Sequence, residues 1–130
     1  MPKRARYGCG ESDLTHYTCH RAPHRMAIDG RLDRPAWRDA PRSPRFVDLV
    51  TGVPDFLETR MASLWDDEYL YVAFWVSEPD VRAKLAERDS LVWTENDVEI
   101  FIGGEDCYYE FEINALGTVY EVFYIWLDAL

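Results

Sequence analysis

A tryptophan and a glutamate that could recognise a sugar together stand six residues apart in the segment LVWTENDVEIFIGG, residues 91–104. The indole of Trp93 can cover the apolar C–H face of a pyranose ring. The carboxylate of Glu99 can accept protons from two neighbouring hydroxyl groups. If both side chains reach solvent on one surface, the pair predicts a binding site for a neutral sugar.

The alternation of apolar and polar residues indicates which side chains share that surface. In the segment 97–102 the valine and isoleucines alternate with acidic residues, so Glu99 points away from the core. In the segment 107–114 the same alternation places Glu112 and Asn114 on the outward face. If the two segments pair, Glu99 lies among these side chains and Trp93 stands at the rim. The predicted ligand-binding residues are Trp93, Glu99, Asn114 and Glu112, and none is predicted to be catalytic.

Two other interpretations of the acidic surface stay open. Acidic side chains on the solvent face of a sheet often bind nothing. Two clustered carboxylates could also act as the acid and base of a glycoside hydrolase, although the sequence fixes no separation between them.

The strand pattern predicts an all-β fold, an antiparallel β-sandwich of the immunoglobulin or jelly-roll kind. Apolar runs at 59–65 and 69–76 flank a short acidic gap and read as a hairpin. Three further strands are expected at 97–102, 107–114 and 118–126, with glycines at the turns between them.

Weaker signals predict the remaining elements. Asp33 could cap a short helical turn that opens at Arg34–Pro35. The segment 78–90 reads as a loop with one or two helical turns, because residues 80–89 have some helical character. The segment 45–60 reads as a short strand followed by a loop. Tryptophans 37, 65 and 75 are interpreted as core residues, and Asp66 and Asp67 as turn residues.

Length and charge limit the function classes. The 130 residues suit one domain, predicted at 25–130 after a flexible N-terminal arm at 1–24. The formal charge of −10 disfavours nucleic acids and anionic membranes as partners, while an oligosaccharide or polysaccharide carries no such penalty. The last apolar run continues to Leu130 and would leave an open sheet edge. The domain is therefore expected to be incomplete at its carboxyl end.

Cysteines and histidines predict neither a disulfide framework nor a metal site. Three cysteines, Cys9, Cys19 and Cys107, are an odd count at irregular spacing. Cysteines and histidines crowd residues 9–24, but their spacing matches no standard zinc pattern. No signal peptide is visible, so the protein is expected in the cytoplasm if the chain is full length.

Four segments, in this order, resemble the family 9 carbohydrate-binding modules. More closely, the chain resembles the bacterial family-9-like proteins of that superfamily, which share a DOMON-type β-sandwich. The segments are IDGRLDRPAW (28–37), LWDDEYLYVAF (64–74), WTENDVEIFI (93–102) and YYEFEINALGTV (108–119).

The resemblance implies roles for individual residues. Family members hold a terminal sugar between two tryptophans, and Trp93 matches the first of them. Glu99 matches the carboxylate that bonds the sugar hydroxyls, and Asn114 matches an asparagine of the site. Glu112 stands where the family has an arginine, which reverses the charge and puts the sugar-end specificity in doubt. The second tryptophan belongs to a part of the family's chain that this sequence does not reach, and Trp126 does not match it.

The resemblance also implies a function. It is non-catalytic carbohydrate binding in support of polysaccharide catabolism, with no cofactor required and with structural calcium in some members. A fragment of a glycoside hydrolase and a protein-interaction β-sandwich without sugar affinity remain the alternatives.

Overall fold

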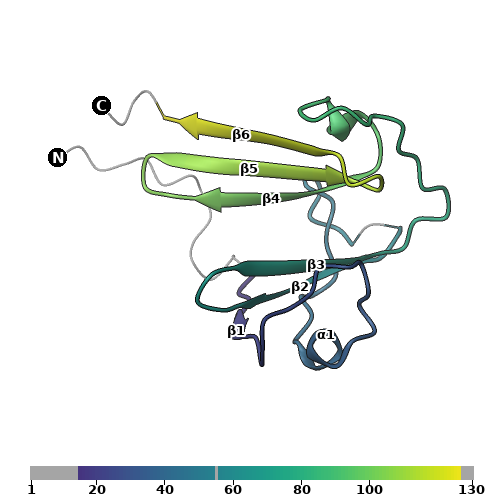
Figure 1. Cartoon of the computed structure of the whole chain (residues 1–130). Coiled ribbons are helices and arrows are strands. Elements are labelled where there is room, and N and C mark those ends of the chain that lie inside the picture. The colour runs from purple at the N-terminus through teal and green to yellow at the C-terminus, as the bar shows by residue number, and fades with distance from the viewer. Residues whose placement is uncertain (1–14, 55, 127–130) are drawn as a thin grey trace. The chain divides into compact units, whose positions relative to one another are not determined.

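The computed structural model describes residues 15–54 and 56–126, and the chain divides into two compact units. The first unit ends at Ser77 and the second begins at Glu78. Each contains one three-stranded sheet, with strand order β1-β2-β3 in the first and β4-β5-β6 in the second (Figure 1).

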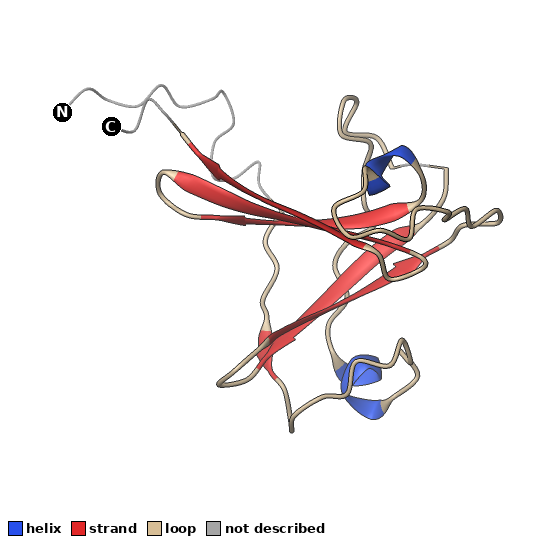
Figure 2. Ribbon diagram, turned by 45° about the horizontal axis from the view of Figure 1, so that its top comes forward, coloured by secondary structure: helices blue, strands red, loops and turns tan. Residues whose placement is uncertain are grey.

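The predicted all-β fold class is confirmed. The described residues contain one α-helix, of five residues, and the sheets are mostly antiparallel (Figure 2). Two such sheets with almost no helix are consistent with a β-sandwich. None of the helices in the described ranges is long and apolar enough to cross a membrane.

In the first unit, the predicted hairpin is formed by β2 (Thr59–Trp65) and β3 (Leu70–Val76). Asp66 closes its turn, as expected. The Asp66 carboxylate accepts hydrogen bonds from the backbone N–H groups of Glu68 and Tyr69, both at 2.8 Å, and from the Tyr71 hydroxyl at 2.6 Å. These bonds, with that from Tyr71 the strongest, lower the pKa of Asp66 against the opposing effect of burial.

Part of the segment predicted as an arm pairs with this sheet. The strand β1 (His20–Arg21) lies parallel to the end of β2. Nearby, the Tyr17 hydroxyl donates to the carbonyl of Pro41 at 2.6 Å and accepts from the N–H of Ser63 at 3.0 Å. Residues 1–14 of the predicted arm, with Cys9, lie outside the described residues. Cys19 and Cys107 are free thiols.

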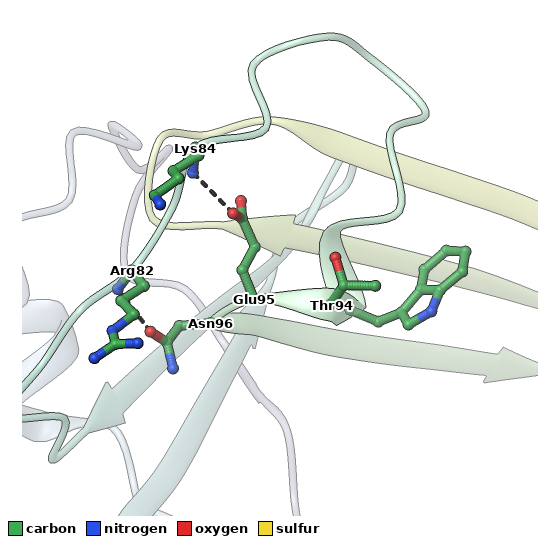
Figure 3. A pocket seen from close by; sticks show the side chains of 6 residues that line it. Arg82, Lys84, Thr94, Glu95 and Asn96 are labelled. Atoms are coloured by element: carbon green, nitrogen blue, oxygen red, sulfur yellow. Dashed lines mark hydrogen bonds between the residues drawn. The ribbon is translucent and has the colours of Figure 1, made fainter.

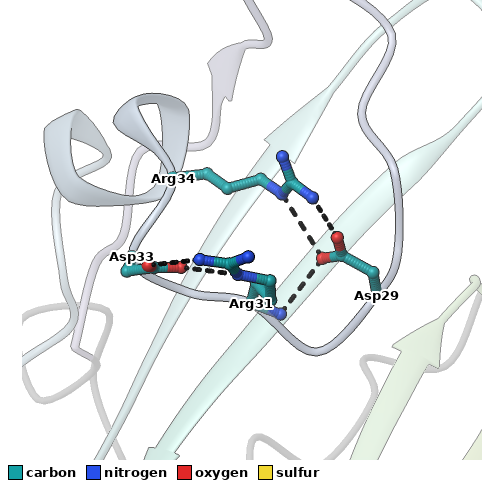
Figure 4. A network of polar contacts seen from close by, with 4 residues as sticks. All are labelled: Asp29, Arg31, Asp33 and Arg34. Carbon is teal, nitrogen blue, oxygen red and sulfur yellow. Dashed lines mark hydrogen bonds and ion pairs between the residues drawn. The ribbon is translucent and has the colours of Figure 1, made fainter.

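The predicted helical turn is present as α1 (Pro35–Asp39), but the predicted cap is wrong. Arg34 occupies the N-cap position and no side chain caps the helix. The Asp33 carboxylate instead binds the guanidinium of Arg31 at 2.9 Å, and Asp29 pairs with Arg34 (Figure 4). The acidic side chains of this loop are therefore engaged by arginines and not by the helix end.

The core of the first unit surrounds Trp37, which α1 presses inward with 3% of its surface exposed. The prediction of a core role is thus confirmed for Trp37. It is wrong for Trp65, which is 40% exposed with the Arg21 guanidinium 4.9 Å above its ring. Trp75 is half-buried and packs against the core cluster.

The second unit contains the other three predicted strands, close to their expected bounds. These are β4 (Asp97–Gly103), β5 (Cys107–Asn114) and β6 (Val119–Ile125), paired as two successive antiparallel hairpins. In the first turn, the Gly104 N–H donates to the Cys107 carbonyl at 2.8 Å. In the second, Gly117 has φ +83°, a conformation that favours glycine.

Two predicted elements differ from the structure. The segment 80–89 is a loop, as predicted, but without the helical turns expected in it, and the 3₁₀ helix η2 (Val92–Thr94) follows it. Side chains take up backbone donors that a helix would have used: Glu95 accepts from the N–H groups of Lys84 and Leu85. Between residues 45 and 58, the expected strand is reduced to a single bridge between Val47 and Pro54.

Trp37→Ala is expected to lower the free energy of unfolding by about 3 to 5 kcal/mol, because it removes a large buried side chain and leaves a cavity. Trp65→Ala is the matched control and should lose less than half as much, since Trp65 is partly exposed. Urea denaturation followed by circular dichroism would measure both losses. Equal losses would contradict the assignment of Trp37 to the core.

Candidate functional site

The acidic residues predicted to share a surface do share one face of the β4-β5 pair. Glu99 lies directly opposite Glu112, and Asp97 lies opposite Asn114. Glu110 lies two residues before Glu112 and points to the same face. The predicted grouping of these acidic side chains on one face is therefore confirmed. The opposite, apolar face is not the more buried one, contrary to the prediction, because Ile102 on it is 52% exposed.

An aromatic pair adjoins this acidic row. Tyr120 on β6 lies opposite Glu112, so Glu99, Glu112 and Tyr120 form one row across three strands. The Trp93 ring, on η2, contacts the Tyr120 ring edge-to-face at a centroid distance of 4.8 Å. Trp93 remains 44% exposed. Since neighbouring strands are about 4.8 Å apart, the strand position of Tyr120 lies about 10 Å from that of Glu99.

Burial separates the two opposed glutamates. Glu99 is exposed, whereas Glu112 has only 2% of its surface exposed. The Glu112 Oε2 atom and the Asp97 Oδ2 atom are buried without a hydrogen-bond partner. The prediction placed Glu112 on an outward face, and alternation does give the face correctly. It does not reveal that this part of the face is covered.

Burial and repulsion between like charges raise the pKa values of the glutamates in the acidic row. Burial, a hydrogen bond with Glu110 and the charges of Glu99 and Asp97 raise the pKa of Glu112 to about 7. Burial and the charges of Asp97 and Glu110 also raise the pKa of Glu99. The row therefore tends to hold a proton near neutral pH.

Asn114 is buried and holds the loop that precedes η2. Its amide nitrogen donates to the Leu85 carbonyl at 2.8 Å and to the Glu95 carboxylate at 2.7 Å. Its oxygen accepts from the N–H groups of Leu116 and Thr118, each at 3.0 Å. The direct ligand contact predicted for Asn114 stays a prediction, and the observed bonds make it an anchor of the 82–96 loop.

Glu95 anchors the loop together with Asn114. It was not among the site residues predicted from the sequence. Burial would raise the pKa of Glu95, but the hydrogen bonds from Lys84 N–H, the Asn114 amide and Leu85 N–H together lower it. Glu95 is therefore a charged carboxylate committed to its own loop.

An open cavity of about 460 Å³ lies beside Trp93 (Figure 3). Its size is within the range of small-ligand pockets. Of the four predicted ligand-binding residues only Trp93 lines it. The lining residues are Arg82, Lys84, Trp93, Thr94, Glu95 and Asn96.

The cavity wall offers hydrogen-bond donors as well as acceptors. Arg82 and Lys84 carry exposed cationic side chains, and the Asn96 side-chain oxygen holds the Arg82 N–H at 2.6 Å. Trp93 thus stands between a wall with cationic donors and a face with acidic acceptors. Asp97 was predicted from the sequence to point to that face with Glu99, although not to bind a ligand. Tyr120 was not predicted, although the alternation of its strand also points to it.

Glu112→Gln is expected to raise the melting temperature above that of the wild type at pH 8.5 in metal-free buffer, and to change it much less at pH 5. The pKa of Glu112 is about 7 in the folded protein against an ordinary value of 4.5. The folded state thus binds the proton more tightly, and the carboxyl destabilises it as the pH rises through this interval. Glutamine carries no charge, so the variant is free of this destabilisation.

Glu121→Gln is a control of opposite sign. Hydrogen bonding from Tyr109 and the charge of Arg88 lower the pKa of Glu121, so its charged form stabilises the fold above its unfolded pKa. This variant should melt below the wild type at pH 8.5. A lower melting temperature for Glu112→Gln at pH 8.5 would contradict the electrostatic assignment of the row.

Comparison with known proteins identifies a family. The family model of carbohydrate-binding family 9 matches residues 53–124, which is more than half of the chain. The match includes the β2-β3 hairpin, η2 and the strands of the acidic face. No curated protein and no solved structure gives a match.

Proposed function

Because the chain belongs to carbohydrate-binding family 9, we propose that it binds a neutral oligosaccharide or polysaccharide without cleaving it, on the face of β4, β5 and β6 that adjoins Trp93. One observation carries the proposal. Trp93 is nearly half exposed and rests on Tyr120, the neighbour of the acidic row. An aromatic surface beside carboxylate acceptors complements the two kinds of surface on a pyranose ring.

Trp93 and Glu99 make the first contacts in this proposal. The apolar face of the sugar stacks on the Trp93 indole, and Tyr120 holds the indole in place. Glu99 is the exposed carboxylate of the row and accepts hydrogen bonds from sugar hydroxyls. The separation of about 10 Å between the Tyr120 and Glu99 strand positions suits a ligand of more than one sugar unit.

Glu112 and Asn114 act behind this contact surface. Both side chains are buried, so the direct sugar contacts that the family resemblance implies stay predictions. We assign Glu112 to supporting the acidic row from its position opposite Glu99. We assign Asn114 to fixing Glu95, and with it the wall of the cavity beside Trp93.

The cavity beside Trp93 provides a second set of contacts. A sugar unit bonded to the one on Trp93 can enter it and accept hydrogen bonds from Arg82 and Lys84. The net charge of −10 favours an uncharged glycan. A role in polysaccharide catabolism follows if such a glycan is degraded by a partner enzyme.

Trp93→Ala is expected to weaken binding of the best oligosaccharide by about tenfold or more, a loss of about 1.4 kcal/mol. Isothermal titration calorimetry against neutral oligosaccharides of glucose, xylose, mannose and galactose would measure it. The wild-type dissociation constant should lie between about a millimolar and a micromolar. Trp65→Ala is a matched control, because Trp65 is similarly exposed and belongs to the other unit.

The outcomes distinguish the alternatives. No heat from any sugar with the intact protein would overturn the proposal and favour a protein-interaction domain. If Trp65→Ala lost as much sugar affinity as Trp93→Ala, the loss would not be specific to Trp93, and its assignment to the binding site would be wrong.

Glu99→Gln is expected to weaken sugar binding by about three- to tenfold, since an amide oxygen is a poorer acceptor than a carboxylate. The same calorimetry measures this loss, and unchanged affinity would exclude Glu99 as an acceptor. An aryl glycoside assay addresses the hydrolase alternative. We expect no turnover, and turnover that disappears on replacing Glu99 or Glu112 would show an enzyme.

A further inference from the structure

A second exposed tryptophan rests on a tyrosine at the other end of the face that carries the acidic row. Trp126, which directly follows β6, is 56% exposed, and its ring contacts that of Tyr108 at a centroid distance of 5.4 Å. The Trp126 N–H donates to the Asp106 carbonyl at 2.9 Å, so the backbone holds this residue beside the start of β5. None of the contacts proposed above uses Trp126.

Tyr108 is the centre of an aromatic cluster on this face. Its ring stacks on that of Tyr124 at a centroid distance of 4.6 Å and lies tilted against that of Phe101 at 6.1 Å. Strand pairing places Tyr108 and Tyr124 opposite each other, on the same side of the sheet as Glu112. Phe101, Tyr108, Tyr124 and Trp126 are called the distal cluster below. Phe101 and Trp126 are its most exposed rings, and both contact the half-buried Tyr108.

The face thus has an exposed tryptophan on a half-buried tyrosine at each end, Trp93 on Tyr120 and Trp126 on Tyr108. Figure 1 shows η2, which carries Trp93, at the end of this sheet opposite to the β4-β5 turn, near which Tyr108 lies. Tyr120 pairs with Glu112, which is four residues after Tyr108, so the two tyrosines are about 14 Å apart along the strands. Stacked rings have centres within about 7 Å of each other. A sugar ring stacked at one end is therefore too far away to stack at the other.

We propose that this face binds along the interior of a linear neutral glycan, with the distal cluster as a second sugar-binding subsite. The inference rests on the carbohydrate binding proposed above and extends it from a sugar at Trp93 to a chain that follows the strands. One sugar ring stacks on Trp93 and a later ring of the same chain stacks on Trp126. The hydroxyl groups of the units between them face the acidic row.

The polar groups between the two ends favour a glycan over a protein partner. Glu110 and Glu112 lie on β5 between the strand positions of the two supporting tyrosines. An apolar protein surface placed over this face would bury carboxylates without giving them hydrogen bonds, which is unfavourable. Sugar hydroxyls can donate to them. Burial and the neighbouring Tyr124 and Glu110 raise the pKa of Tyr108, so its hydroxyl stays protonated and can donate to a sugar oxygen.

Calorimetry with a series of linear oligosaccharides, from the disaccharide to the hexasaccharide of the neutral sugar that binds best, tests the second subsite. The wild-type affinity should rise at least about tenfold along the series, because only the longer ligands reach Trp126. Trp126→Ala and Tyr124→Ala should each weaken hexasaccharide binding by about three- to tenfold and change disaccharide binding less than about twofold. Trp93→Ala should weaken the binding of both ligands.

Phe123→Ala is the matched control, because Phe123 is 57% exposed and adjoins Tyr124 on the opposite face of β6. It should leave both affinities unchanged. Circular dichroism would show whether each variant folds, and the series with the wild type needs no variant.

The outcomes separate this inference from the proposed function. If the wild type binds the disaccharide and the hexasaccharide equally tightly, the second subsite is wrong while binding at Trp93 stands. The same conclusion follows if folded Trp126→Ala and Tyr124→Ala both bind the hexasaccharide as the wild type does, and the distal cluster would then suit a protein partner. If no sugar binds at all, the proposed function and this inference are both wrong.

Discussion

The side chains of Glu99 and Glu112 face each other across two hydrogen-bonded strands, and like charges in that position weaken a sheet. A proton held by the row reduces this repulsion, but the pairing itself keeps the two side chains opposite each other. A shift of one residue would exchange the apolar and acidic sides of a strand. The acidic row is therefore fixed by the same backbone bonds that hold the second unit together. Such a local conflict within an otherwise regular sheet is typical of functional sites in proteins.

The loop that forms the cavity wall beside this row is held mainly by side chains and not by strand pairing. The 82–96 loop is held by side chains, above all the carboxylate of Glu95 and the amide of Asn114, which bond to each other and to the loop backbone. The loop backbone adds bonds of its own, from the Asn96 N–H to the Arg82 carbonyl at 3.1 Å and from the Asp89 N–H to the Val119 carbonyl at 2.9 Å. Trp93 thus stands where a wall held largely by side chains meets a sheet held by its backbone.

Much of the fold could be predicted from the sequence, because alternation in the strands and glycine or acidic residues at the turns are local signals. The hairpin of β2 and β3 and the facing of Glu99 and Glu112 follow from them. Burial of Glu112 and Asn114 could not be predicted, since burial depends on contacts between segments that are distant in the sequence, such as those of Asn114 with Leu85 and Glu95. The prediction of helical turns at 80–89 was wrong for the same reason. Local propensity was outweighed by hydrogen bonds to Glu95 and Asn96.

The short turn between β4 and β5 limits which insertions this part of the chain can accept. Gly104 and Cys107 bond there at 2.8 Å, and a methyl group on Gly104 would come within 3.1 Å of the Cys107 sulfur. A single inserted residue would have to be absorbed as a bulge. If no bulge formed, the register of β5 would shift by one residue. The two sides of that strand would then be exchanged, and Phe111 and Ile113 would lie on the side where Glu112 now lies. Family members whose links differ here by one residue should therefore present different amino acids on this face, even when the strand sequences themselves are alike.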